Sequence, residues 1–167
     1  MRRVASLGVL LLGLAGPLAA QGESGIKVGS TAPVLAVNDL DGKPVNLGQW
    51  IGKKPVVFEF WATWCENCEA LLPRFMAARQ QTGDKVEYVW VNVTVNQSQN
   101  RVRRYVEEHK LPFRILYDDQ GASTRAYQAP ATSYVVIVDK AGKVVYTGVG
   151  ADQAFEPALK RVAGVTE

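Results

Sequence analysis

The chain has 167 residues, of which 19 are lysine or arginine and 16 are aspartate or glutamate, giving a formal net charge of +3. A charge this close to neutrality excludes a broad polyanion-binding surface, so we expect no nucleic-acid partner. The length suits a single domain with an adequate hydrophobic core, and we expect a monomer.

The first twenty residues have the pattern of a secretory signal peptide. Arg2 and Arg3 precede an apolar run at 4–14, and small residues end the segment at Ala20. The run is shorter than the roughly 20 residues of a membrane span, although an uncleaved N-terminal anchor stays open. We therefore expect export to the periplasm or cell envelope. The predicted divisions are a leader at 1–20, a flexible linker at 21–29 and a folded domain at 30–167.

Strands and helices alternate along the predicted domain. Their order, ending in a hairpin and a helix, predicts an α/β architecture with a central mixed β-sheet flanked by helices. Apolar and β-branched runs predict strands at 34–37, 44–47, 56–60, 86–95, 114–117, 134–138 and 143–147. Apolar residues at three- and four-residue steps predict a helix at 66–80, and an N-cap serine with an apolar side predicts one at 98–110. Two further helices are expected at 121–127 and 152–162.

Both cysteines of the chain lie two residues apart, at Cys65 and Cys68, directly after the strand at 56–60. A cysteine at the start of a helix is activated by the unpaired N–H groups and the helix dipole, which favour the thiolate. We therefore assign Cys65 as the attacking sulfur and Cys68, about one turn further along, as the resolving sulfur. A purely structural disulfide is the weaker interpretation of such a small ring.

Glu59 interrupts the apolar strand six residues before Cys65. Alternation along a strand places it on the same side as Val57 and Trp61. A buried acid has a raised pKa, so Glu59 can exchange a proton with Cys68 near neutral pH. A glutamate that reaches water at the sheet margin is the alternative.

The other candidate site residues are aromatic or potential metal ligands. Trp64 precedes Cys65 and is expected to flank it as an apolar contact surface, whereas Trp50, Trp61 and Trp90 are expected in the core. His109 follows two glutamates on a distant helix and is expected to face solvent. A closed zinc site requires four ligands, and the chain offers only two cysteines and one histidine, so we predict no metal centre. Cu(I) held by the two thiolates alone is chemically possible.

The segment Phe60-Trp61-Ala62-x-Trp64-Cys65-x-x-Cys68, with a proline at Pro73, resembles the active-site helix of the thioredoxin superfamily. The upstream Gly29-x-x-Ala32-Pro33 and the Asp41-Gly42-Lys43 turn are similar to exported TlpA/ResA-like thiol–disulfide oxidoreductases and the related redoxin group. The resemblance covers about residues 28–160. It implies a thioredoxin-like fold with an N-terminal β-hairpin extension, and Glu59 matches the superfamily's buried acid.

The resemblance also implies an activity and its partners. The expected function is reduction of disulfides in protein substrates of the cell envelope, with electrons from a membrane thiol donor. We expect no cofactor beyond the redox-active Cys65–Cys68 pair. A Cu(I)-binding metallochaperone using the same thiols and a peroxidatic redoxin are the alternatives.

Two features depart from the family pattern. Glu66-Asn67 stands between the cysteines where many relatives have a proline, and a carboxylate beside the sulfurs disfavours the thiolate and favours the reductase direction. The cis-proline that faces the cysteines in this superfamily has only Pro130 as a candidate, about three residues early. Either the chain bulges there or Ser133 takes the place, so Pro130, Thr132 and Ser133 are the candidate substrate-binding residues beside Trp64.

Overall fold

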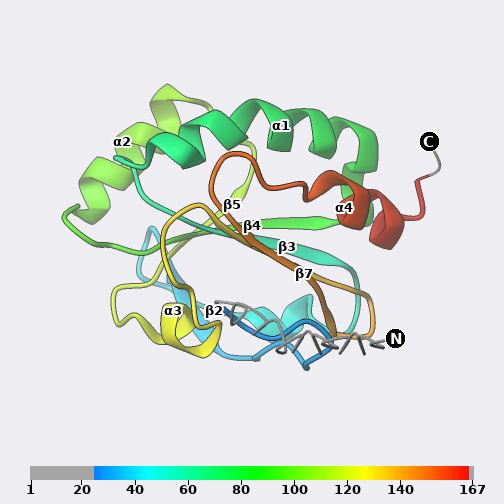
Figure 1. Cartoon of the computed structure of the whole chain (residues 1–167). Helices are drawn as coiled ribbons and strands as arrows, with labels where there is room; N and C mark the ends of the chain where they lie inside the picture. The colour runs from blue at the N-terminus through cyan, green and yellow to red at the C-terminus, as the bar shows by residue number, and fades with distance from the viewer. Residues whose placement is uncertain (1–24, 166–167) are drawn as a thin grey trace, which may run out of the picture.

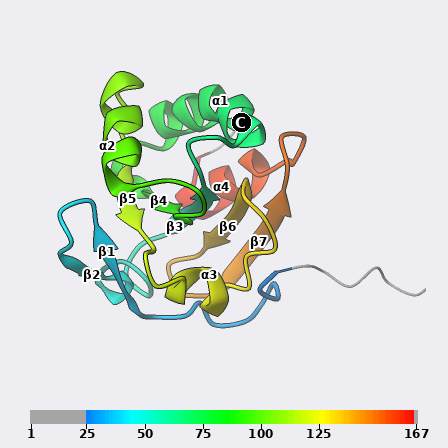
Figure 2. The ribbon, with the colours of Figure 1, turned by 90° about the vertical axis from the view of Figure 1, so that its left-hand side faces the viewer.

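The computed structural model describes residues 25–165 of the chain. Seven strands form one sheet in the order β2-β1-β5-β4-β3-β6-β7 (Figures 1 and 2). Strands β3, β4 and β5 run parallel to one another, whereas the β1–β2, β1–β5, β3–β6 and β6–β7 pairs are antiparallel. The elements are β1 (Ala36–Asp39), β2 (Pro44–Asn46), η1 (Leu47–Gln49), β3 (Val56–Trp61), α1 (Glu66–Thr82), η2 (Gly83–Lys85), β4 (Glu87–Asn92), α2 (Gln99–Glu108), β5 (Arg114–Tyr117), α3 (Ala122–Ala126), β6 (Tyr134–Val138), β7 (Val144–Val149) and α4 (Glu156–Ala163).

Helices cover both faces of this sheet. Helices α1, α2 and α4 lie on one face, and the short α3 and the N-terminal segment lie on the other (Figures 1 and 2). The predicted mixed sheet with flanking helices is confirmed, as is the N-terminal hairpin, which β1 and β2 form around the turn at 40–43.

Strand β3 at the centre of the sheet supplies side chains to both cores. Val57 and Trp61 pack with α1 and α4, whereas Phe58 and Phe60 pack in the cluster on the opposite face. All six residues of β3 are buried, as expected for a central strand with both faces covered. The strand therefore leads directly from the middle of the sheet to the two cysteines at the start of α1.

The packed domain begins earlier than the sequence predicts. Ile26, which falls in the predicted linker, is only 6% exposed, and its N–H donates to the Tyr134 hydroxyl at 2.9 Å. The Gly29 N–H donates to the Val144 carbonyl at 2.7 Å. Residues 25–29 are thus part of the domain, because a buried isoleucine and backbone hydrogen bonds hold them against β6 and β7.

The predicted leader at 1–20 lies outside the described residues. Within 25–165, no helix has the length and apolar character needed to cross a membrane.

Several predicted elements are shorter than expected, and two of them deserve an explanation. The strand predicted at 86–95 ends at Asn92, and beyond it Thr94 and Asn96 adopt left-handed backbone conformations with φ of 64° and 53°. The last helix begins at Glu156 and not at Asp152. Arg74 of α1 accounts for this later start, because its guanidinium binds the carbonyls of Ala151 and Gln153.

Candidate functional site: the dithiol at the start of α1

Cys65 and Cys68 form a disulfide at the N-terminus of α1, with an S–S distance of 2.01 Å. Cys65 is the N-cap residue, and its Sγ accepts a hydrogen bond from the Cys68 N–H at 3.1 Å. The two residues are 8% and 3% exposed. Cys65 is therefore the more accessible of the pair and lies where helix N–H groups stabilise a thiolate after reduction. The geometry suits the predicted order of attack by Cys65 and resolution by Cys68.

The first turn of α1 also carries acidic side chains. Glu66 and Glu69 both lie there and are exposed. Their charges oppose that of a Cys65 thiolate, whereas the helix dipole favours it. The site thus combines one stabilising and one destabilising influence on the same sulfur.

Glu59 is the buried acid of the site. Its side chain is 0% exposed, and neither carboxyl oxygen has a hydrogen-bond partner among residues 25–165. Burial raises the pKa of Glu59 well above its usual range. Its strand neighbours Val57 and Trp61 pack in the same core cluster as Cys68, which puts Glu59 on the α1 side of the sheet. This burial contradicts the alternative of a solvated glutamate, and the proton-carrying role stays a prediction.

Trp64 lies at the surface beside the disulfide and is 44% exposed. Its indole N–H donates to the Val95 carbonyl at 2.8 Å, and the Thr63 N–H donates to the Gln97 side chain at 3.0 Å. The segment between β4 and α2 therefore holds the loop that precedes Cys65. The sequence gives little sign of this segment, because Val95 reads as the last residue of a predicted strand and only the structure shows it exposed.

Two hollows meet at Trp64. One, of about 380 Å³, is lined by mostly apolar or small side chains, among them Val95, Ala131 and Thr132, with Arg125 as its only charged residue. The other, of about 270 Å³, is lined by Trp64, Cys65, Glu66, Asn67 and Thr132. The predicted site residues Trp64 and Thr132 are thus brought together with Cys65.

Pro130 does not occupy the place expected for a cis-proline. It is exposed and lines neither hollow, and residues 25–165 contain no cis peptide bond. Ser133 directly precedes β6 and is 1% exposed, with a left-handed φ of 59°. Of the two possibilities that the sequence left open, the structure therefore favours Ser133. Pro130 falls early because Ala131 and Thr132 separate it from that position.

The remaining aromatic and ligand-type residues behave largely as expected. Trp50, Trp61 and Trp90 are buried, and His109 is exposed with its ring stacked on Tyr105 at 3.9 Å between centroids. No group of three or more potential His, Cys, Asp or Glu ligands occurs within the described part of the chain. A Cu(I) ion at this site would therefore rest on the two thiolates alone.

The comparisons with known proteins agree with this fold and site. The Redoxin family model matches residues 27–162. A thioredoxin-like protein of Bacillus subtilis is 33% identical over 77% of this chain and 75% of its own length. The thiol–disulfide oxidoreductase ResA of Geobacillus thermodenitrificans is 30% identical over 84% of this chain and 80% of its own length.

A solved structure supports the fold alone. The thioredoxin domain of a thiol–disulfide oxidoreductase from Bacteroides vulgatus superposes with a TM-score of 0.69 at 24% identity, over 82% of this chain and 99% of that domain. From the family match, the related sequences and the Cys65–Cys68 pair, we conclude that the chain belongs to the Redoxin family, among its thioredoxin-like thiol–disulfide oxidoreductases.

Proposed function

We propose that the protein is an exported thiol–disulfide oxidoreductase that reduces disulfides in protein substrates. The observation that carries the proposal is the position of Cys65. It caps α1, its sulfur accepts the Cys68 N–H at 3.1 Å, and it lines a hollow with the exposed Trp64. A nucleophilic sulfur, a resolving sulfur and a contact surface thus lie within one turn of helix.

The reaction proceeds by two thiol–disulfide exchanges. The Cys65 thiolate attacks one sulfur of the substrate disulfide, which forms a mixed disulfide and releases the other substrate sulfur as a thiolate. The Cys68 thiolate then attacks Cys65 Sγ and releases the second substrate sulfur. Two electrons pass to the substrate, which takes up two protons, and the protein is left as the Cys65–Cys68 disulfide.

Glu59 supplies the route for the proton on Cys68. The resolving thiol must lose its proton before it attacks. Burial raises the pKa of Glu59 toward that of a thiol, so once it is ionised Glu59 can exchange a proton with Cys68. Glu59 lies on the sheet face that α1 covers, where Cys68 packs. The cycle needs no bound cofactor, because the two sulfurs carry both electrons.

The surface around Cys65 favours a protein substrate. Trp64 is 44% exposed and Val95 is 53% exposed, and both border the mostly apolar hollow of about 380 Å³. An apolar hollow of this size is suited to side chains that flank a cysteine in an unfolded or partly folded chain. Trp64 and Thr132 are the contacts we assign to the substrate.

The acidic first turn favours the reducing direction. Glu66 and Glu69 oppose the negative charge of the thiolate, so they make the reduced form less stable and the dithiol a better electron donor. Leader-like residues at 1–20 suggest that this chemistry takes place outside the cytosol. There a membrane thiol donor would have to return the dithiol to its reduced state, because exported disulfides persist.

Reduction of insulin disulfides by the purified protein tests the activity, with peroxide turnover and Cu(I) titration measured in parallel. We expect insulin reduction that is lost in Cys65→Ser. A protein that left insulin oxidised while turning over peroxide or binding Cu(I) tightly would overturn the proposal. Cys68→Ala leaves the attacking sulfur and removes the resolving one, so it should trap substrates as mixed disulfides in cells. Cys65→Ala/Cys68→Ala, which cannot form them, is the matched control.

A further inference from the structure

Ser133 lies directly before β6 in a backbone conformation that a serine rarely adopts. Its φ is 59°, in the left-handed region, although it has a side chain. Such conformations persist where surrounding contacts outweigh their cost. The neighbouring Thr132 lines the hollow that contains Cys65, so the conformation of Ser133 affects what the disulfide faces.

Three hydrogen bonds hold Ser133 in this conformation. Its hydroxyl donates to the Thr132 carbonyl at 2.5 Å and accepts from the Gly150 N–H at 3.1 Å. Its carbonyl accepts from Nε2 of Gln153 at 2.8 Å. Two of the three bonds therefore come from the segment that follows β7, which lies next to β6 in the sheet.

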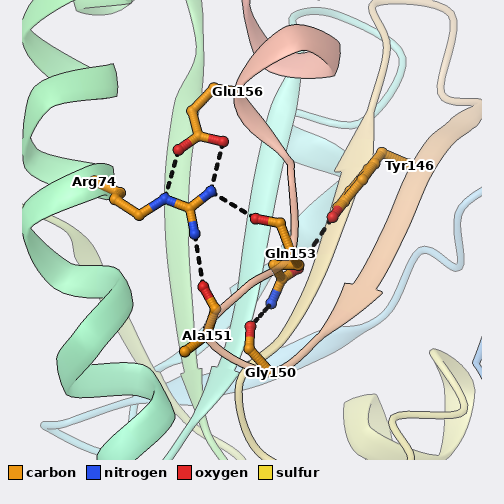
Figure 3. A network of polar contacts seen from close by, with 6 residues as sticks. All are labelled: Arg74, Tyr146, Gly150, Ala151, Gln153 and Glu156. Atoms are coloured by element: carbon orange, nitrogen blue, oxygen red, sulfur yellow. Dashed lines mark hydrogen bonds and ion pairs between the residues drawn. The ribbon is translucent and has the colours of Figure 1, made fainter.

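Gln153 is built into this contact. Its side-chain nitrogen also donates to the Gly150 carbonyl at 2.7 Å, and its oxygen accepts from the Tyr146 hydroxyl at 3.4 Å (Figure 3). The residue is 9% exposed. Gly148 leaves room for it, because a Cβ there would lie 2.6 Å from the Gln153 side-chain oxygen. The amide therefore has a defined orientation with both of its N–H groups used.

Arg74 ties the same segment to the helix that Cys65 caps. Its guanidinium donates to the Ala151 and Gln153 carbonyls, each at 2.6 Å (Figure 3). It also forms a two-point ion pair with Glu156, at 2.6 and 2.8 Å. The contacts thus close a ring that runs from Cys65 along α1 to Arg74, across to Gln153, and through Ser133 to Thr132 beside the disulfide.

We propose that Gln153 is a positioning residue of the exchange site, which fixes Thr132 and Ser133 as the wall that substrate meets opposite Cys65. This inference rests on the proposed function for the use of that wall. Gln153 touches neither sulfur in the described contacts, so it acts on the backbone that receives a peptide substrate. A small disulfide that reaches Cys65 without contacting Thr132 should therefore not depend on Gln153.

The test compares two disulfide substrates in two variants. Gln153→Met keeps the size of the side chain and removes both donors, and Gln153→Glu keeps its shape but cannot donate when ionised. Gln80→Met, at an exposed position on α1, is the matched control. With dithiothreitol as the electron donor, we expect the KM for insulin to rise roughly tenfold in both Gln153 variants with kcat little changed. We expect the second-order rate constant with which the pre-reduced protein reduces 5,5′-dithiobis(2-nitrobenzoate), in a single turnover, to stay within about twofold of wild type.

Amide hydrogen exchange provides a readout that does not depend on turnover. The Gly150 N–H donates to the Ser133 hydroxyl, so its exchange should quicken in the Gln153 variants and not in Gln80→Met. Unchanged exchange, an unchanged insulin KM, or equal losses on both substrates would overturn the inference. A wild-type protein that reduces neither substrate would instead refute the proposed function, while faster Gly150 exchange in the variants would still support the positioning contact.

Discussion

Glu59 and Trp90 are register partners on the adjacent parallel strands β3 and β4, and both are buried without a hydrogen-bond partner for their side-chain polar atoms in the described part of the chain. The unpartnered atoms are the two Glu59 carboxyl oxygens and the Trp90 indole nitrogen, and Trp61 Nε1 is a third such group in the same core cluster. Burying polar groups without partners is costly, and most of all for a charged carboxylate. This core therefore favours Glu59 in its neutral form.

Glu59→Gln should remove a pH dependence of folding stability. Burial raises the pKa of Glu59 well above its ordinary value. For an acid whose pKa is raised on folding, stability is fully present below the unfolded-state pKa and is lost as pH rises through the folded-state pKa. We expect wild type to lose stability above about pH 4.5 and the variant to lose less. Urea denaturation from pH 4 to pH 9 measures this, with the exposed Glu108→Gln as control. An equal change of the free energy of unfolding with pH in all three proteins would contradict the prediction.

The same variant should slow the step that Cys68 performs. If Glu59 accepts the Cys68 proton, its loss should reduce the rate of mixed-disulfide resolution at neutral pH by at least about tenfold. The initial attack by Cys65 should change far less, so the mixed disulfide should accumulate. Rapid acid quenching followed by mass spectrometry of the intact protein measures both steps. Resolution at the wild-type rate across the pH range would remove Glu59 from the mechanism.

Trp64→Ala should weaken the binding of protein substrates. The side chain is 44% exposed and borders both hollows beside the disulfide. An exposed aromatic at the centre of a contact surface commonly contributes about 2 kcal/mol, so the KM for insulin should rise roughly thirtyfold. Trp64→Phe keeps an aromatic face and loses the hydrogen bond to the Val95 carbonyl and one ring of the indole, so its KM should change less. Val28→Ala, at an apolar residue 43% exposed in the N-terminal segment, is the control. Equal KM values in Trp64→Ala and wild type would contradict this contact.

Arg74→Met should destabilise the fold. The substitution leaves the Ala151 and Gln153 carbonyls and the Glu156 carboxylate without their donor, which should cost about 2 kcal/mol. Arg79→Met, at an exposed position on the same helix, should cost much less. Urea denaturation at pH 7 compares the two variants, and equal losses would show that the Arg74 contacts contribute little.

The Arg74–Glu156 pair should also affect stability in acid. Burial raises the pKa of Glu156, but the hydrogen bond and charge of Arg74 outweigh it and hold the pKa below its ordinary value. An acid whose pKa is lowered on folding stabilises the folded state at pH values above its unfolded-state pKa. This stabilisation is lost as pH falls through the folded-state pKa. Wild type should therefore lose this contribution below about pH 4.5, and Arg74→Met should lose less over that range. Thermal melts from pH 5 to pH 2 measure the difference. The same fall of melting temperature with decreasing pH in wild type and Arg74→Met would contradict the prediction.

Ser133→Ala should cost stability because it loses both hydrogen bonds of the hydroxyl, while the left-handed backbone and its strain remain. We expect a loss of about 1–3 kcal/mol in the free energy of unfolding. Ser133→Gly loses the same hydroxyl but adopts a φ of 59° without strain, so it should be more stable than the alanine variant. Chemical denaturation ranks the three proteins. An alanine variant as stable as the glycine variant would show that Ser133 is not strained.

Patterns between near neighbours in the sequence were enough to predict the sheet, its helices and the dithiol. The apolar run at 56–60, the Cys65–Cys68 spacing and the alternation that puts Glu59 with Val57 are each set within a few residues, where periodicity reports burial directly. The structure confirms the architecture and the placement of Cys65 at the start of α1. The residues at which strands and helices end were predicted less accurately. A strand can end before left-handed residues such as Thr94, which have no distinctive sequence signal.

The tertiary structure alone decided what surrounds the dithiol. Arg74 meets Ala151 across 77 positions of sequence, and Gln153 meets Ser133 across 20. Neither pair leaves a periodic pattern, since each depends on which strands and helices become neighbours in space. Packing also buried Ser133 while it left Pro130 exposed, and it brought the Val95 carbonyl to Trp64. Local sequence thus determined the reactive sulfurs, and long-range contacts determined the wall that a substrate would meet beside them.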